Sequence, residues 1–192
     1  MAPFVGLTGG LGAGKSEALR LLGELGAATL STDAVVHELL EGDDLRDELV
    51  ARLGPEIAPG GRLERSRIAE RVFGDEEARA WLEKTLWPRV GERVAAWRME
   101  VGNDRVAVVE VPLLFESGME AAFDHTIAVV ADEDVREERA AARGHASIAE
   151  RAGRQLTQAE KADRADFTVR NDGSLEELKE SLSQVLGKLE ET

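Results

Sequence analysis

The chain has no cysteine, and its 192 residues include only three histidines. Without cysteine, disulfides, thiolate nucleophiles and cysteine-based metal sites are excluded. The histidines, at positions 37, 125 and 145, are scattered and show no HExxH or two-histidine spacing, so we expect no catalytic or metal-bound histidine. No GxSxG sequence is present either, which leaves serine-nucleophile chemistry without support.

Positive charge and long apolar runs are also scarce. Lysine and arginine number 24 against 38 acidic residues, a formal net charge of -14, and this charge would repel a nucleic-acid backbone. The chain has no apolar run of about eighteen residues, and its first expected strand starts too early to leave room for a signal peptide. We therefore expect a cytoplasmic protein, with no nucleic-acid or membrane partner, that works as a monomer.

The most specific pattern lies near the beginning, where residues 9–16 fit GxxxxGK[ST] directly after the apolar residues 4–7. The glycines let several backbone N–H groups turn toward a phosphate, while Lys15 can reach the β and γ phosphates and Ser16 can bind Mg²⁺. Residues 17–25 have the apolar spacing of a helix, so strand, loop and helix follow in the required order. A simple glycine-rich turn would not account for Lys15 and Ser16. The pattern predicts a site for a nucleoside triphosphate.

The remaining apolar runs predict a parallel α/β sheet. Runs at 4–7, 27–30, 106–111, 126–130 and 167–169 alternate with helical patterns. Roughly seventy-five residues without a convincing strand separate the second run from the third, far more than one crossover helix needs, so we expect a helical insertion there. It contains Trp81, Trp87 and Trp97, which either fill a small helical core or line an apolar groove for a substrate, and Pro88 is expected to begin a new helix.

A second helical segment, residues 132–164, concentrates arginines in an otherwise acidic chain. They are Arg136, Arg139, Arg143, Arg151, Arg154 and Arg164. One interpretation is a solvated face with ion pairs such as that of Asp132 with Arg136. The other is a lid whose arginines close over phosphate oxygens as charge gathers on them during transfer. For the second role we favour Arg143 and Arg154, followed by Arg139 and Arg151.

Carboxylates follow two of the expected strands, at the sheet edge where ligands bind in open α/β folds. Asp33 follows the second strand and can orient an acceptor hydroxyl and take its proton, or hold Mg²⁺ through water; a helix N-cap is the alternative. Glu110 lies within the third strand, where a carboxylate can support a metal, and Glu116 lies beyond it. Both can equally cap helices or face water.

Together these segments resemble the dephospho-CoA kinase family over nearly the whole chain. The resemblance rests on residues 5–16, the segment around Asp33, the Val-Pro-Leu-Leu-Phe-Glu run at 111–116, and the residues from Gln155 to Asp166 followed by Asn171. It implies one kinase domain over residues 1–192, with a doubly wound parallel sheet of five strands of the P-loop NTPase type. The core would comprise about 1–40, 104–131 and 165–192, with a helical acceptor-binding insertion at about 41–103 and a helical ATP lid at about 132–164.

The resemblance also implies ATP-dependent, Mg²⁺-assisted phosphorylation of the ribose 3′-hydroxyl of dephospho-CoA, giving CoA and ADP in the last step of coenzyme A synthesis. Lys15 and Arg143 would stabilise the transferring group, Asp33 would be the base, and Ser16 would bind Mg²⁺. The implied ATP-binding residues are Gly10, Leu11, Gly12, Ala13, Gly14, Lys15, Ser16, Glu17, Arg139, Arg143 and Arg154. The implied acceptor-binding residues are Asp33, His37, Trp81, Leu113, Leu114 and Glu116.

Four positions depart from the family pattern. Ser31 replaces the first of two usual acids, His37 replaces an arginine, Glu17 replaces a threonine and Trp87 replaces a histidine. None of these changes removes Lys15, Ser16 or Asp33, so we expect an active enzyme. Another P-loop small-molecule or nucleoside monophosphate kinase, a nucleotide-binding switch and a silent homologue remain as alternatives, although the chain has neither an NKxD nor a DxxG motif of a switch.

Overall fold

The computed structural model describes residues 1–142 and 155–191. The chain divides into two compact units, Met1–Ser31 with Arg98–Thr192, and Thr32–Trp97. The first unit contains the sheet, and the second is helical. Helix α2 (Thr32–Leu39), which the sequence predicts as part of the core, belongs to the second unit.

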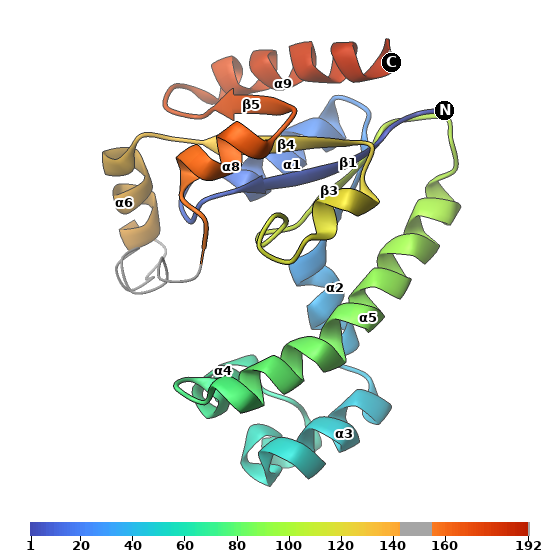
Figure 1. The fold of residues 1–192 in the computed structure, drawn as a ribbon, viewed down its shortest axis with the longest axis vertical. Helices are drawn as coiled ribbons and strands as arrows, with labels where there is room; N and C mark the ends of the chain where they lie inside the picture. Colours follow the sequence, from blue (N-terminus) through green and yellow to red (C-terminus); the bar gives the residue numbers. More distant parts are fainter. Residues whose placement is uncertain (143–154, 192) are drawn as a thin grey trace. The chain divides into compact units, whose positions relative to one another are not determined.

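All five expected strands form in the first unit, in one parallel sheet. They are β1 (Phe4–Gly9), β2 (Ala28–Ser31), β3 (Ala107–Glu110), β4 (His125–Val130) and β5 (Phe167–Arg170), in the spatial order β2-β3-β1-β4-β5. Figure 1 labels four of them, β3, β1, β4 and β5. Every neighbouring pair is parallel. The predicted α/β class is therefore confirmed, and the carboxyl ends of the strands share one edge of the sheet.

One face of this sheet is covered by α1 (Lys15–Glu24) and α9 (Leu175–Glu190), which share a core with alternate residues of the strands, such as Leu7 and Ile127. Helix α9 begins after Ser174, whose hydroxyl caps the Glu177 N–H while the Glu177 carboxylate caps the Ser174 N–H. Its predicted apolar stripe is buried, at Leu178, Leu182, Val185, Leu186 and Leu189.

The intervening residues of β1 face the opposite side, where α8 (Gln158–Arg164) and the loop after β3 lie. A Cβ atom added at Gly6 would come within 3.0 Å of both Leu114 and Phe123, so glycine lets this loop approach the sheet closely. Helix α8 packs against β4 and β1. The first unit also contains α6 (Glu133–Ala142) and a 3₁₀ turn, η3 (Met119–Ala122).

The second unit is built from helices and short 3₁₀ turns. Besides α2 it contains α3 (Asp43–Leu53), η1 (Pro55–Ile57), η2 (Pro59–Gly61), α4 (Arg65–Val72) and most of α5 (Glu76–Val101). Its small core includes Leu45, Leu49 and Ile57. Trp81 packs against this core, and the Arg52 guanidinium lies 5.9 Å from its ring centre. These contacts favour the core interpretation for Trp81.

The prediction that Pro88 begins a new helix is wrong, because α5 runs unbroken from Glu76 to Val101 with Pro88 inside it. A proline within a helix removes one backbone donor and crowds the preceding turn. Pro88 removes the helical donor of the Lys84 carbonyl, and the Arg89 guanidinium donates to the next carbonyl along, that of Thr85, over 2.7 Å. Buried neighbours on both sides, Thr85 and Val90, add packing that offsets the cost.

In the part of the chain that the structure describes, none of the helices combines the length and apolar character needed to span a bilayer.

Candidate functional site

The phosphate loop joins β1 to α1, as the sequence predicts. Its backbone is tightly turned, with the Ala13 N–H donating to the Gly10 carbonyl over 3.2 Å and the Lys15 ammonium donating to the same oxygen over 3.0 Å. Gly14 precedes α1 in the left-handed conformation, with φ of 92°, and Gly12 has φ of 78°. Both values disfavour residues with a side chain. Helix α1 therefore begins at the loop, so the positive end of its dipole lies there.

The loop is also crowded from outside by other segments of the first unit. A Cβ atom at Gly12 would lie 2.5 Å from the Arg136 carbonyl oxygen, and one at Gly14 would lie 2.1 Å from the Asn171 amide nitrogen. Asn171 donates to the Ala13 carbonyl over 2.9 Å and is buried. The two glycines are thus required by space as well as by conformation, and the loop is held against α6 and the segment after β5.

Ser16 contacts Glu110 at the carboxyl end of β3, and Ser31 ends the neighbouring strand β2. The Ser16 hydroxyl donates to the Glu110 carboxylate over 3.4 Å, and Glu110 is only 4% exposed. The strand register pairs Ser31 with Glu110. A hydroxyl and a carboxylate are oxygen ligands of the kind that Mg²⁺ prefers. The described residues contain no group of three histidine or acidic side chains suited to a metal.

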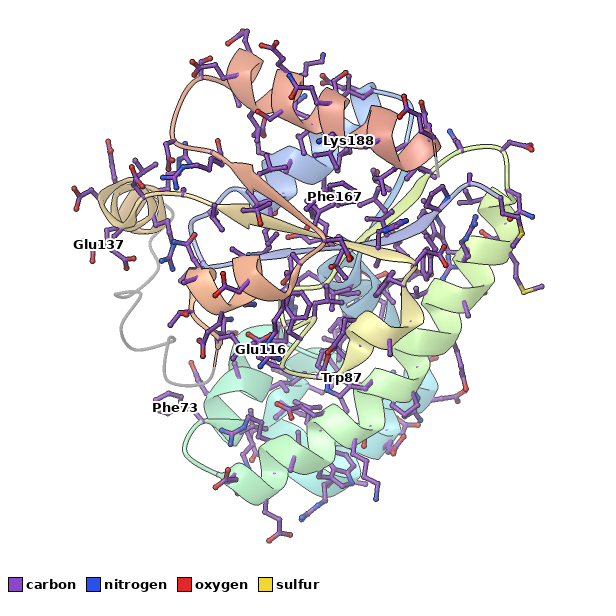
Figure 2. All side chains as sticks on the ribbon, turned by 45° about the horizontal axis from the view of Figure 1, so that its top comes forward. Phe73, Trp87, Glu116, Glu137, Phe167 and Lys188 are labelled. Carbon is purple, nitrogen blue, oxygen red and sulfur yellow. The ribbon has the colours of Figure 1, made fainter. Side chains whose placement is uncertain are left out.

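A buried ion pair fixes the loop after β3 to α8. The Lys161 ammonium, with no exposed surface, donates to the Pro112 carbonyl over 2.7 Å and lies 2.9 Å from one carboxylate oxygen of Glu116. That oxygen also accepts from the Leu156 N–H over 2.9 Å. Figure 2 labels Glu116 beside α8, and its second carboxylate oxygen is buried without a hydrogen-bond partner among the described residues. No role is predicted for Lys161 from the sequence, because no spacing rule links a lysine to a glutamate 45 positions away.

Two arginines of α6 contact the phosphate-loop region. Arg139 donates to the Asn171 carbonyl over 2.9 Å. Arg136 donates to the Leu11 carbonyl over 2.9 Å, a role that the sequence did not suggest. The ion pair proposed between Asp132 and Arg136 is absent: Arg136 pairs with Glu133 at 3.0 Å, one turn along the same helix face. Asp132 pairs instead with Arg170 at 2.6 Å.

The remaining donor-side residues divide into two groups. Glu17, in the first turn of α1, pairs with Arg20. Arg143, Arg151 and Arg154 lie outside the described residues. Their assignment to ATP phosphates stays a prediction, as does that of Arg139.

Asp33, His37 and Trp81 belong to the second unit. Asp33 is exposed and lies in the first turn of α2, inside the helix and not before it. His37 is also exposed, 3.9 Å from the Glu41 carboxylate. It lines a pocket of about 840 Å³ whose walls include Leu40, Arg46, Leu63 and Arg65. This pocket lies within one unit, and its walls carry both arginines and the acidic residues Glu41, Asp43 and Glu64.

The two leucines assigned to the acceptor differ in burial. Leu113 is half-buried, whereas Leu114 is fully buried and packs against Gly6. The burial of Leu114 shows a packing role beneath the loop; contact with an acceptor stays a prediction for both.

Comparison with known proteins gives one consistent family. The family model for dephospho-CoA kinase matches residues 3–177. A dephospho-CoA kinase of Protochlamydia amoebophila is 39% identical over 193 aligned positions, covering 96% of this chain and 95% of that protein. Among solved structures, a Thermus thermophilus protein superposes with a TM-score of 0.81 at 35% identity, covering 97% of each chain. The dephospho-CoA kinase of Campylobacter jejuni shares the fold, with a TM-score of 0.72 at 22% identity and coverage of 98% of this chain and 97% of that one.

Proposed function

Since the chain belongs to the dephospho-CoA kinase family, we propose that it transfers the γ-phosphoryl group of ATP to the ribose 3′-hydroxyl of dephospho-CoA, giving CoA and ADP. The observation that carries this proposal is a complete phosphate loop, with Lys15, Ser16 and Glu110 in one unit, in a chain that matches the family over residues 3–177. The reaction is the last step of coenzyme A synthesis.

On the donor side, backbone N–H groups of residues 10–16 would bind the ATP phosphates. Lys15, whose ammonium now donates to the Gly10 carbonyl, would exchange that bond for a phosphate oxygen and stabilise the charge that gathers during transfer. Arg139 lies next to the loop through Asn171 and is a further candidate for phosphate contact. Arg143 and Arg154 are proposed for the same role from the sequence alone.

Ser16 and Glu110 would hold Mg²⁺, Ser16 directly and Glu110 as its supporting carboxylate. The bound ion supplies positive charge to the phosphate oxygens. Because the Ser16 hydroxyl already faces a carboxylate oxygen, the pair needs little rearrangement to accept a cation.

On the acceptor side, Asp33 would accept the proton of the ribose hydroxyl as its oxygen attacks the γ-phosphorus and ADP leaves. The exposure of the Asp33 carboxylate supports this role, because it is free of the buried packing that would keep a substrate away. His37, Trp81, Leu113, Leu114 and Glu116 are proposed acceptor contacts. The pocket beside His37, whose walls are apolar in part and carry charges of both signs, offers a concave site for part of an acceptor.

The experiment that tests this function measures ADP release with Mg²⁺·ATP and each of four acceptors: dephospho-CoA, AMP, CMP and shikimate. We expect turnover with dephospho-CoA only. Turnover of another acceptor, with none of dephospho-CoA, would favour a different small-molecule kinase. Tight nucleotide binding without turnover of any acceptor would favour a switch or a silent homologue.

We also propose that the enzyme acts as a cytoplasmic monomer that does not bind nucleic acid. The formal charge of -14 supports the last point, because it opposes binding to a phosphate backbone. Light scattering on the purified protein at working concentration tests the monomer, and a molar mass near twice 20.8 kDa would contradict it.

A further inference from the structure

Three neighbouring carbonyl groups of the phosphate loop are each bonded by a different side chain. The Gly10 oxygen accepts from Lys15, the Leu11 oxygen from Arg136 on α6, and the Ala13 oxygen from Asn171 after β5. Lys15 is part of the loop's own motif, whereas the other two come from segments more than a hundred residues away in the chain. The loop is thus held from outside by contacts that its own sequence does not contain.

Arg136 makes several contacts with the loop. Its side chain is only 9% exposed, its Nε donates to the Leu11 carbonyl over 2.9 Å, and its Nη1 pairs with Glu133 at 3.0 Å. A Cβ atom added at Gly10 would lie 3.0 Å from Nη2 of the same guanidinium. The backbone of Arg136 packs on Gly12. One residue of α6 therefore touches three consecutive residues at the tip of the loop.

The geometry of the peptide group turns this contact into a constraint on nucleotide binding. A peptide unit is planar and trans, so its C=O and the following N–H point in opposite directions. When Arg136 holds the Leu11 carbonyl on its own side, the Gly12 N–H must point to the other side of the loop. Asn171 fixes the Gly14 N–H in the same way through the Ala13 carbonyl. Without such contacts Gly12 would be free to turn, because glycine has little conformational preference.

We propose that Arg136 is a positioning residue for ATP binding: it holds the Leu11–Gly12 peptide so that the Gly12 N–H faces the phosphates. The proposal rests on the assignment of residues 10–16 to the phosphates of ATP. It gives Arg136 a role distinct from that of a lid arginine, since it acts through the loop backbone and does not itself touch a phosphate. It also predicts that nucleotide binding changes the conformations of α6 and the loop together.

The test compares Mg²⁺·ADP affinity, by titration calorimetry on the full chain, among four variants. Arg136→Met keeps the apolar stem and removes every donor. Arg136→Lys keeps the charge but cannot bond the Leu11 carbonyl and Glu133 together with one planar group. Glu133→Gln removes the ion pair and leaves the bond to Leu11. Arg170→Gln is the matched control, an exposed arginine paired with Asp132 and Asp172 and without a bond to the loop.

We expect Arg136→Met to weaken ADP binding roughly tenfold, as expected for the loss of a hydrogen bond from a charged group. KM for ATP should rise by a similar factor, and KM for dephospho-CoA should stay unchanged. Arg136→Lys should recover part of the affinity, and Glu133→Gln and Arg170→Gln should bind ADP as the wild type does. A purely structural role would instead lower the unfolding midpoint without separating the two KM values.

Two results would overturn the proposal: wild-type ADP affinity in Arg136→Met, or an equal loss in Glu133→Gln, which would assign the effect to the helix ion pair. If Arg136→Met does not fold, wild-type affinity in Arg136→Lys would overturn it instead, because lysine lacks the planar group. The ADP titration requires no acceptor, so its result can be interpreted even when dephospho-CoA is not a substrate.

Discussion

The phosphate loop and the first turns of α2 are built in opposite ways. Around the loop, buried side chains such as Asn171 and Arg136 hold backbone carbonyls in place. On α2, Asp33 and His37 are exposed on a short helix of eight residues. The donor site is therefore fixed largely by backbone geometry, whereas the acceptor side depends on a few solvent-exposed side chains. Substitutions of the buried side chains that hold the loop should affect folding as well as activity, and those of the exposed side chains on α2 should affect activity alone.

The largest effect is expected at the centre of the donor site, in Lys15→Ala. Turnover should fall by about 10³-fold or more, the range seen when a cation that stabilises phosphoryl transfer is removed. The fold should persist, because the Gly10 carbonyl that the ammonium bonds also accepts from the Ala13 N–H and so keeps a donor. A coupled enzyme assay of ADP release measures the rate, and urea unfolding measures the stability. Lys84→Ala, at an exposed position of α5, is the control, and a Lys15→Ala enzyme with near-normal turnover would refute the assigned role.

Asp33→Asn tests the acceptor side with a change of similar size. Loss of a general base should lower kcat by about 10²- to 10⁴-fold. Mg²⁺·ADP affinity and the free energy of unfolding should not change, because Asp33 is exposed and makes no contact that supports the fold. The matched control is Asp44→Asn, an exposed carboxylate in the first turn of α3 in the same unit. Retention of near-normal turnover by Asp33→Asn would remove the base from the mechanism.

Lys161→Met tests whether the stability of the first unit depends on buried polar contacts. It leaves the Glu116 carboxylate, only 13% exposed, without its cation, which should cost about 3–5 kcal/mol in the free energy of unfolding. Urea unfolding measures the loss. The double variant Lys161→Met with Glu116→Gln should recover part of it, because no charge is then buried alone. Equal stabilities of the single and double variants would mean that the ion pair is not what the fold depends on.

The contrast between the two regions also explains how far the sequence could be interpreted. The five strands and the phosphate loop were predictable because apolar runs and the GxxxxGK[ST] spacing are local signals. Arg136 and Lys161 were not, since each meets a backbone carbonyl brought near by tertiary packing, and a carbonyl leaves no mark in the sequence. The prediction at Pro88 was wrong for a related reason, since burial of neighbouring side chains on α5 lets a helix continue through a proline.

Ser31→Asp restores the acid that the family usually has. Ser31 ends β2 and directly precedes α2, so this variant tests the residue that joins the sheet to the acceptor-side helix. The strand register places this residue beside Glu110, so two carboxylates would lie together. Their repulsion should lower the free energy of unfolding by about 1 kcal/mol without metal. With Mg²⁺ and nucleotide bound, Ser31→Asp should instead be more stable than the wild type, because the two carboxylates would then share a cation. Thermal unfolding with and without Mg²⁺·ADP measures both, and Ser31→Asn is the uncharged control. A stability loss that Mg²⁺·ADP does not reverse would contradict a metal at this position.

The smallest effect concerns the start of α8, which carries Lys161. The backbone N–H and hydroxyl of Thr157 donate to the Glu160 carboxylate over 2.8 Å each, and these bonds lower the pKa of Glu160 below its ordinary value. A carboxyl group with a lowered pKa in the folded state stabilises the fold above its unfolded pKa of about 4.3, and this contribution is lost as the pH falls through the folded value. Glu160→Gln should therefore be less stable than the wild type near neutral pH, and the difference should shrink in acid.

Urea unfolding at about pH 7 and about pH 3 measures both differences, with Glu137→Gln, at the exposed residue of α6 labelled in Figure 2, as the control. A Glu160→Gln difference that does not change with pH would mean that the cap acts through shape and not through charge. In that case the stability of the first unit near Lys161 would depend on the buried ion pair with Glu116 and not on the charge of the exposed cap.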